Sequence, residues 1–231
     1  MEQVGILKTV QVGTPHRYGS ADAVEPLERR WKTSFFRVPS AQSRWLYTTH
    51  LEGNEQADKK HHGSLSQAAL LYASAHYPLW RAELERPEMG PGGFGENFTV
   101  EGLAEDNACI GDVYALGEAR IRVTGPRYPC WKIERRWQVA GLTERVAASG
   151  RTGWYCCVLQ EGRVEPGLPI LLVERPYPEW TIALINDFAH LRNGDVEKAE
   201  AAAACPLLQE MWGPLIVKHA RKVQRGKVMN G

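Results

Sequence analysis

Short apolar runs bounded by Gly, Pro, Asn or Asp recur through the first 175 residues of the chain. In GEARIRVTG (117–125), small and apolar residues alternate with charged ones, a pattern typical of a strand with one face in water. Eight runs are predicted to be strands, over residues 6–12, 34–38, 44–47, 98–101, 113–116, 119–124, 154–159 and 170–173. We therefore expect a mainly β fold, a largely antiparallel barrel or sandwich.

Helical spacing of apolar residues predicts one helix within the β-rich part and three helices after it. Ser64 followed by Gln67 has the form of a capping box, and the helical pattern continues to Tyr77, where Pro78 should end the helix. Beyond ERPYPEW (174–180), helices are expected over 180–191, from the cap Asp195 to 204, and over 215–223. The predicted domains are a β-barrel over 1–175 and a small three-helix domain over 176–231.

Composition narrows the class of protein without naming a partner. The 231 residues carry 28 Lys and Arg and 27 Asp and Glu, and a net charge of +1 gives no reason to expect a nucleic-acid polymer or a membrane surface as partner. The N-terminus lacks the pattern of a signal peptide and no apolar run is long enough to span a membrane, so we predict a cytoplasmic protein. Five cysteines without clustered spacing argue against a disulfide framework, a zinc site and an iron–sulfur cluster.

One cysteine stands out because cations surround it. In GPRYPCWKIERR (125–136), Cys130 lies between Arg127 and Lys132, and nearby cations favour the thiolate, the form that reacts and binds metals. The segment is therefore a candidate reactive centre. The alternative reading is a basic surface turn beside an inert buried cysteine.

Two other segments have the composition of ligand-binding turns. GPGGFG (90–95) contains G-x-G-x-x-G, but it neither follows a predicted strand nor opens a helix, so a dinucleotide-binding loop is not expected. Glu96 and Asn97 follow Gly95 directly and can make directed hydrogen bonds. His62, in HHG (61–63), precedes the predicted helix N-terminus, where free backbone N–H groups favour an anion.

Six motifs in order give a family resemblance over nearly the whole chain. They are QADxxxHG (56–63), HYxxW (76–80), GxFGEN (92–97), IGD (110–112), PCWK (129–132) and SGRTGWY (149–155). Together they resemble the YiiM branch of the MOSC domains, the molybdenum-cofactor sulfurase C-terminal family, and the segment from ERPYPEWT onward resembles the three-helix "3-alpha" domain of that branch. The common HGGxxKA motif reads HGSLSQA here, so Ser64 replaces a glycine and Gln67 a lysine.

The resemblance implies a MOSC β-barrel with inserted helices, a pocket for the molybdenum cofactor (molybdopterin), and Cys130 as the residue that contacts the metal. It also implies reduction of an N–OH group to N–H, as in resistance to N-hydroxylated bases such as 6-hydroxylaminopurine. No flavin or iron–sulfur motif is visible, so a separate reductase is predicted as electron donor. Homodimerisation stays open.

Other residues are then candidates for roles at that site. Arg127, Lys132, Arg37 and Arg151 can hold the cofactor phosphate, because a guanidinium offers a bidentate fork. His62 can donate a proton to the departing hydroxyl or steady the pterin. Asn97 can bind a pterin edge, while Glu96 and Gly95 belong to the same turn and Glu96 can brace it. Each cation is equally open to a role as a plain surface charge.

Three functions follow from these residues. The leading hypothesis is a molybdenum-dependent reductase of N-hydroxylated bases and related compounds. The second is a cofactor or sulfur carrier that uses Cys130 without turnover of its own. The third is a metal-free hydrolase or transferase that uses a Cys/His pair.

Overall fold

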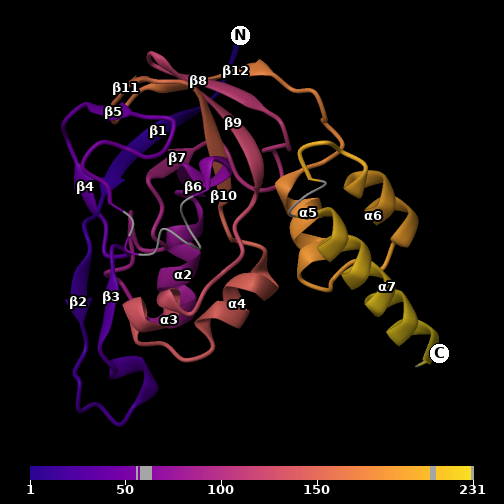
Figure 1. Ribbon diagram of the computed structural model, residues 1–231, viewed down its shortest axis with the longest axis horizontal. Coiled ribbons are helices and arrows are strands. Elements are labelled where there is room, and N and C mark those ends of the chain that lie inside the picture. Colours follow the sequence, from indigo (N-terminus) through magenta and orange to yellow (C-terminus); the bar gives the residue numbers. More distant parts are fainter. Residues whose placement is uncertain (56, 58–63, 209–211, 230–231) are drawn as a thin grey trace.

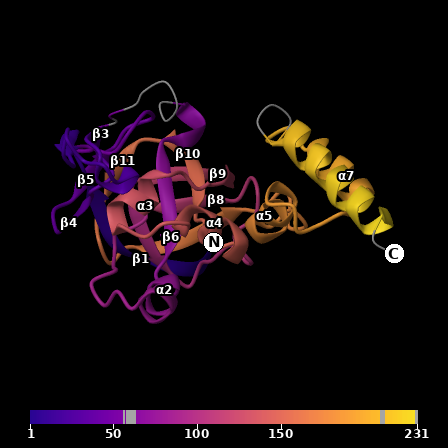
Figure 2. The same ribbon diagram turned by 90° about the horizontal axis from the view of Figure 1, so that it is seen from below.

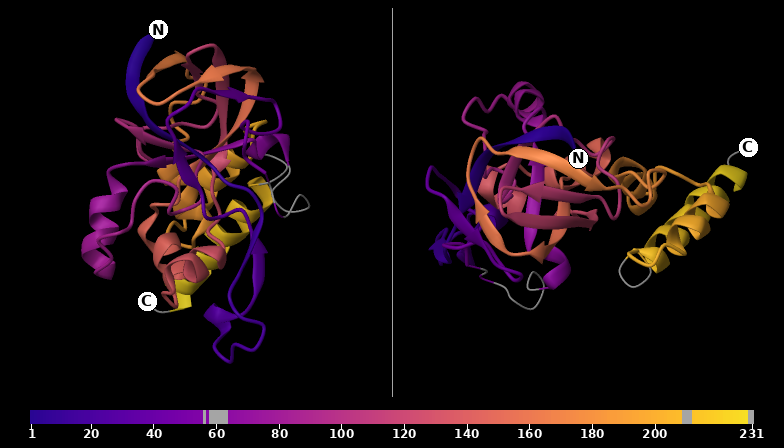
Figure 3. Two further views of the ribbon diagram at one scale, coloured as in Figure 1. Left: turned by 90° about the vertical axis from the view of Figure 1, so that its left-hand side faces the viewer. Right: turned by 90° about the horizontal axis from the view of Figure 1, so that it is seen from above.

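A computed structural model gives the fold and describes residues 1–55, 57, 64–208 and 212–229. Its centre is a closed β-barrel of seven strands, in which the first strand of the chain pairs with the last (Figure 1). In pairing order the strands are β12 (Pro169–Glu174), β8 (Val113–Leu116), β9 (Ala119–Pro126), β10 (Trp154–Gln160), β6 (Ala69–Ala73), β7 (Phe98–Glu101) and β1 (Glu2–Val12). The view from above in Figure 3 shows the closed ring. The mainly β prediction is confirmed.

The barrel strands follow the alternation seen in the sequence. In β9, Ala119, Ile121 and Val123 are fully buried, whereas Arg120 between them is exposed. The pairs around the barrel are antiparallel except for β6 with β7, which run parallel. The predicted strands at 98–101 and 113–116 match β7 and β8, while the other barrel strands extend beyond their predicted ends.

Smaller strands lie outside the barrel. β4 (Val38–Ser40) adds to the edge of β1, and β5 (Arg44–Leu46) pairs with β11 (Gly162–Val164). A hairpin of β2 (His16–Tyr18) and β3 (Trp31–Thr33), with the short helix η1 (Pro26–Glu28) in its connection, extends away from the barrel (Figure 1). The predicted strand at 34–38 is wrong except for Val38, since β4 begins only there.

The helix predicted from Ser64 to Tyr77 is also wrong. Ser64 does cap a short helix, η2 (Leu65–Gln67), but the strand β6 follows at once. All five residues of β6 are buried, so its sequence shows no alternation of apolar and polar residues. Such a run cannot be distinguished by pattern from a segment of a buried helix. Pro78 does not end a helix but lies in the first turn of α2 (His76–Leu84), where a proline costs no hydrogen bond.

Two helices that the sequence analysis missed complete the lower side of the barrel. α3 (Lys132–Trp137) and α4 (Leu142–Ser149) lie with α2 below the strands in Figure 1. They share a second apolar core with the barrel, built around Tyr72, Trp80 and Phe94. α3 begins two residues after Cys130, so this core supports the segment that carries the thiol.

Three helices follow the barrel, as predicted. They are α5 (Ile182–Ala189), α6 (Val196–Ala203), capped by the Asp195 side chain as expected, and α7 (Gly213–Met229), which is longer than expected. Figure 2 shows α5 next to the strands and α7 farther out. The main core continues from the barrel into all three helices. The domain boundary between residues 175 and 176 stays a prediction. No helix in the described ranges is long and apolar enough to cross a membrane.

A buried ion pair fixes the connection between barrel and helices. Asp112, of the IGD motif, is fully buried and accepts two hydrogen bonds from Arg175, at 2.8 and 2.7 Å. The same carboxylate accepts the Cys109 N–H (2.9 Å) and the Tyr114 hydroxyl (2.7 Å). Because Arg175 follows β12 directly, these bonds hold the start of the linker against the barrel.

We expect Arg175→Gln to lower the free energy of unfolding by about 2–4 kcal/mol, because it leaves the Asp112 carboxylate buried without its cation. Urea unfolding measures this effect. Arg86→Gln is the matched control, since its pair with Glu88 spans 3.9 Å in water and should change stability by less than about 0.5 kcal/mol. Equal effects of the two variants would contradict the structural role of the pair.

His190, at the junction of barrel and helices, makes the free energy of unfolding depend on pH. His190 ends α5, its ring lies 5.1 Å from that of Tyr128, and its Nε2 is buried without a partner among the described residues. Burial, and then the charges of Arg192 and His219, lower the pKa of His190 from 6.5 to about 4. The folded protein therefore binds this proton less readily than the unfolded chain does.

The difference between the pKa of His190 in the unfolded and the folded chain adds to the free energy of unfolding. This contribution is fully present above about pH 6.5 and is lost as the pH falls to about 4. We expect His190→Gln to reduce the acid-induced loss of unfolding free energy over that range by about 1–2 kcal/mol. Urea unfolding at both ends of the range tests this, with the exposed His16→Gln as control. An unchanged acid slope in His190→Gln would show that other groups titrate.

Candidate functional site

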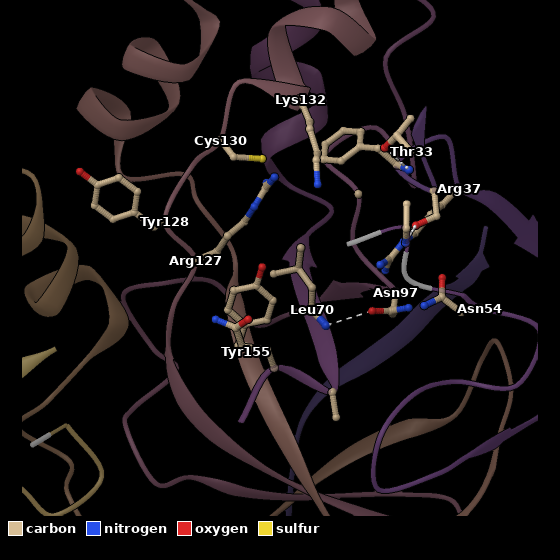
Figure 4. Close-up of a pocket in the computed structure, with 16 residues that line it drawn as sticks. Thr33, Arg37, Asn54, Leu70, Asn97, Arg127, Tyr128, Cys130, Lys132 and Tyr155 are labelled. Atoms are coloured by element: carbon tan, nitrogen blue, oxygen red, sulfur yellow. Dashed lines mark hydrogen bonds between the residues drawn. The ribbon is translucent and has the colours of Figure 1, made fainter. Parts of the chain in front are cut away.

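One pocket opens where several barrel strands begin or end, and most of the predicted site residues line it (Figure 4). Its walls come from the loop after β3, the glycine loop before β7, the segment between β9 and α3, and the first residues of β6 and β10. Its free volume is about 80 Å³. The lining residues are Thr33, Ser34, Phe35, Arg37, Asn54, Ala57, Gln67, Ala68, Leu70, Gly95, Asn97, Arg127, Tyr128, Cys130, Lys132 and Tyr155.

Cys130 lies at this pocket and is partly accessible to solvent. Figure 4 shows its sulfur turned inward, toward the side to which the Arg127 and Lys132 side chains also point. Its neighbours in the same segment, Tyr128 and Trp131, are about half exposed. The thiol is therefore not an inert core group: it faces a cavity lined by cations.

Two arginines face the pocket with buried donors that have no partner among the described residues. They are Nε and Nη1 of Arg37 and Nη1 of Arg127. Burial outweighs the attraction of Glu96 and lowers the pKa of Arg37 to about 10, so Arg37 remains a cation at neutral pH. A cation buried without a counter-ion costs folding free energy. Such groups are typical of an anion-binding site.

Asn97 offers the pocket a further donor. Its Oδ1 accepts the Leu70 N–H at 3.2 Å (Figure 4), which fixes the orientation of the amide. Its Nδ2 is buried and has no partner within the described part of the chain. The sequence-based expectation of a directed hydrogen-bonding group at this position fits that geometry.

Glu96 and Gly95 act differently from Asn97. The Glu96 carboxylate is fully buried and accepts the Gly92 N–H (2.7 Å), the Phe94 N–H (3.1 Å) and the hydroxyls of Thr99 and Tyr77. It holds the glycine loop together and does not line the pocket. Gly95 does line it, at a φ of +75°, and a side chain there would collide with the Phe35 ring.

One other predicted residue that the structure describes, Arg151, is not brought to this pocket. Arg151 lies elsewhere: its guanidinium bonds to Glu83 at 2.8 Å and stacks 3.7 Å from the centre of the Trp80 ring. Because Glu83 already neutralises it, Arg151 does not join the cations beside Cys130. His62 lies outside the described residues, so its predicted role is neither supported nor opposed.

The sequence analysis missed several residues of the pocket. Tyr155 ends the SGRTGWY motif, and burial raises the pKa of its phenol despite the nearby cation of Arg127. Asn54 and Phe35 come from loops without a motif. The place of Tyr155 in a motif could have identified it as a site residue, whereas no feature of the sequence indicated Asn54 or Phe35.

The remaining cysteines do not share the site. Cys109, Cys156 and Cys205 are buried, and Cys157 lies on the opposite face of β10 from Cys156, as the strand alternation predicts. Within the described ranges, no three His, Cys, Asp or Glu side chains are grouped to hold a metal ion. Among the described residues that line the pocket, Cys130 alone has a thiol, carboxylate or imidazole side chain.

Comparison with known proteins agrees with the fold and the motifs. Residues 58–171 match the MOSC domain. The crystal structure of YiiM from Geobacillus stearothermophilus is 30% identical and superposes with a TM-score of 0.74 over 94% of this chain and 99% of that one. YiiM from Escherichia coli is 38% identical over 128 residues, 54% of this chain and 57% of that protein.

A protein of Gibberella moniliformis named "Reductase" is 36% identical over 148 residues, which are 63% of this chain but only 26% of that protein. The similarity to the Geobacillus structure covers nearly both full lengths, and the MOSC match spans β6 to β12 of the barrel. The chain therefore belongs to the YiiM family of MOSC-domain proteins.

Proposed function

We propose that this protein binds the molybdenum cofactor in the Cys130 pocket and reduces N-hydroxylated bases, such as 6-hydroxylaminopurine, and related N-hydroxylated compounds. The observation that carries the proposal is the convergence of one partly accessible thiol with two buried arginines, each of which has guanidinium N–H donors without partners among the described residues. Membership of the MOSC family and similarity to a relative named a reductase support the oxidoreductase class.

The donors of the pocket fit the anionic end of the cofactor. Arg37, Arg127 and Asn97 together present four buried N–H-bearing atoms without described partners, and a phosphate accepts such donors well. A water molecule takes about 30 Å³ of the liquid, so a cavity of about 80 Å³ admits a phosphate-sized group. The pterin ring system is larger, and its binding requires the pocket to widen.

The thiol fits the metal end. Molybdenum favours soft sulfur ligands, and a cysteine must lose its proton to bind a metal. Lys132 and Arg127 point to the same side as the Cys130 sulfur. Gln67, which replaces the family's usual lysine, also lines the pocket, so we assign the cationic role to Lys132 and the two buried arginines.

When bound, the cofactor would supply a centre that can pass two electrons to the substrate. The balanced reaction takes R–NH–OH, two electrons and two protons to R–NH₂ and water. A separate reductase supplies the electrons. Because burial raises its pKa, the Tyr155 phenol stays protonated at neutral pH and can donate a hydrogen bond from the pocket wall. His62 remains the predicted proton donor.

We expect Cys130→Ser to lose bound molybdenum and to lower turnover by at least about 100-fold, since the loss of a metal ligand costs more than the 10–100-fold typical of its supporting residues. The protein is expressed in a host that makes the cofactor. Its molybdenum content is measured by elemental analysis, and reduction of 6-hydroxylaminopurine is followed with an artificial electron donor.

Cys109→Ala is the control, because Cys109 lies outside the pocket and should keep both molybdenum and turnover. Stoichiometric cofactor without turnover in the parent protein would favour the carrier hypothesis. Full turnover in protein from cofactor-deficient cells would contradict the molybdenum proposal and favour a metal-free enzyme.

We further expect Arg37→Gln and Arg127→Gln each to weaken retention of the cofactor by about 10–100-fold, because a hydrogen bond to a charged group contributes about 1.5–3 kcal/mol. The measurement is molybdenum content after stepwise dialysis. Arg17→Gln, at an exposed position of the β2–β3 hairpin, serves as control. Unchanged retention in both pocket variants would show that the phosphate binds elsewhere.

A further inference from the structure

A second cavity lies behind the wall of the Cys130 pocket. Its volume is about 420 Å³, and it is lined by residues of β9, β10 and η2 and by Pro206, Leu207 and Trp212. Figure 1 shows these strands on the side of the barrel that faces the C-terminal helices. Gln67 and Tyr155 line both cavities, so they form the partition between them.

One cation, Arg122, lines this second cavity and has no counter-ion among the residues that the structure describes. Arg122 is half-buried, its Nε is fully buried, and its guanidinium makes no hydrogen bond or ion pair with any residue that the structure describes. Among its described lining residues, no other has a charged side chain. A partly buried guanidinium in this state favours an anionic partner.

Part of the remaining wall is apolar, and part of that is aromatic. Trp212 is 5% exposed and packs against Gly125, where an added Cβ would lie 2.4 Å from the indole nitrogen. Leu207 and Pro126 belong to the same lining. The volume falls in the range of small-molecule sites, about 300–1,000 Å³. A flat apolar body would replace water against these surfaces.

We propose that this cavity is a binding site for a small aromatic monocarboxylate, whose carboxylate pairs with Arg122 and whose ring lies against Trp212 and Leu207. A single cation matches a single negative charge, whereas a phosphate dianion would enter with one charge uncompensated. The proposal is independent of the molybdenum cofactor. It does place a ligand directly behind Tyr155 and Gln67, residues of the Cys130 pocket.

The test uses 2-naphthoate as probe, with 2-naphthamide as a neutral probe of the same shape. Isothermal titration should give saturable binding of 2-naphthoate with a dissociation constant below about 1 mM and at least about 10-fold weaker binding of the amide. Arg122→Gln should weaken naphthoate binding at least about 10-fold. The matched control is Arg120→Gln, two positions away on β9 and exposed, which should leave binding unchanged.

Labelling with iodoacetamide locates the probe. Cys157 lines the second cavity and Cys130 the first, so bound naphthoate should slow labelling of Cys157 and leave that of Cys130 unchanged, as read by mass spectrometry. Protection of Cys130 alone, equal affinities for the acid and the amide, or absence of saturable binding at millimolar concentration would each overturn the proposal. The comparison of acid with amide uses the parent protein and does not depend on how Arg122→Gln folds.

Discussion

Pairing of the first strand with the last closes the barrel, and the position of the candidate site depends on this closure. β1 pairs with β12 on one side and β7 on the other, and Val10, two residues before the end of β1, lies opposite Phe98, the start of β7. β7 in turn pairs with β6, and β6 with β10. The glycine loop and the Cys130 segment are far apart in the sequence, but they come to the same end of the barrel because these registers are linked.

The charges at that end are distributed unequally. Glu96 lies between the pocket residues Gly95 and Asn97, but its carboxylate accepts hydrogen bonds from the glycine loop and forms no ion pair with Arg37 or Arg127. Arg37 and Arg127 thus keep buried donors free of described partners. A native fold tolerates such costs mainly where a ligand recovers them. The net charge of +1 gives no indication of this local concentration of positive charge.

The three C-terminal helices are integrated with the barrel. They share the main core with the barrel and are held at the linker by Asp112 and Arg175, and Pro206, Leu207 and Trp212, which follow α6 and precede α7, line the second cavity. The two cavities share Tyr155 and Gln67.

The sequence by itself determined the fold class, the barrel strands with one wet face, the three C-terminal helices and the Asp195 cap. These features depend on local periodicity and on hydrogen bonds between near neighbours, which a single sequence displays. It also predicted Cys130, Asn97, Arg127, Lys132, Arg37 and Gly95 as site residues, through the motifs and the resemblance that they gave, and all six line one pocket.

Only the tertiary structure decided the remainder. β6 is covered on both faces, and this removed the alternation that would have identified it as a strand. Arg151 and Arg127 look alike in sequence, yet Glu83 reaches one and no described counter-ion reaches the other. Tyr155, Phe35 and Asn54 enter the pocket through strand register and loop packing. The pairing of charged side chains and the packing of loops around the pocket depend on contacts between residues far apart in the chain. These contacts exist only after the barrel has closed.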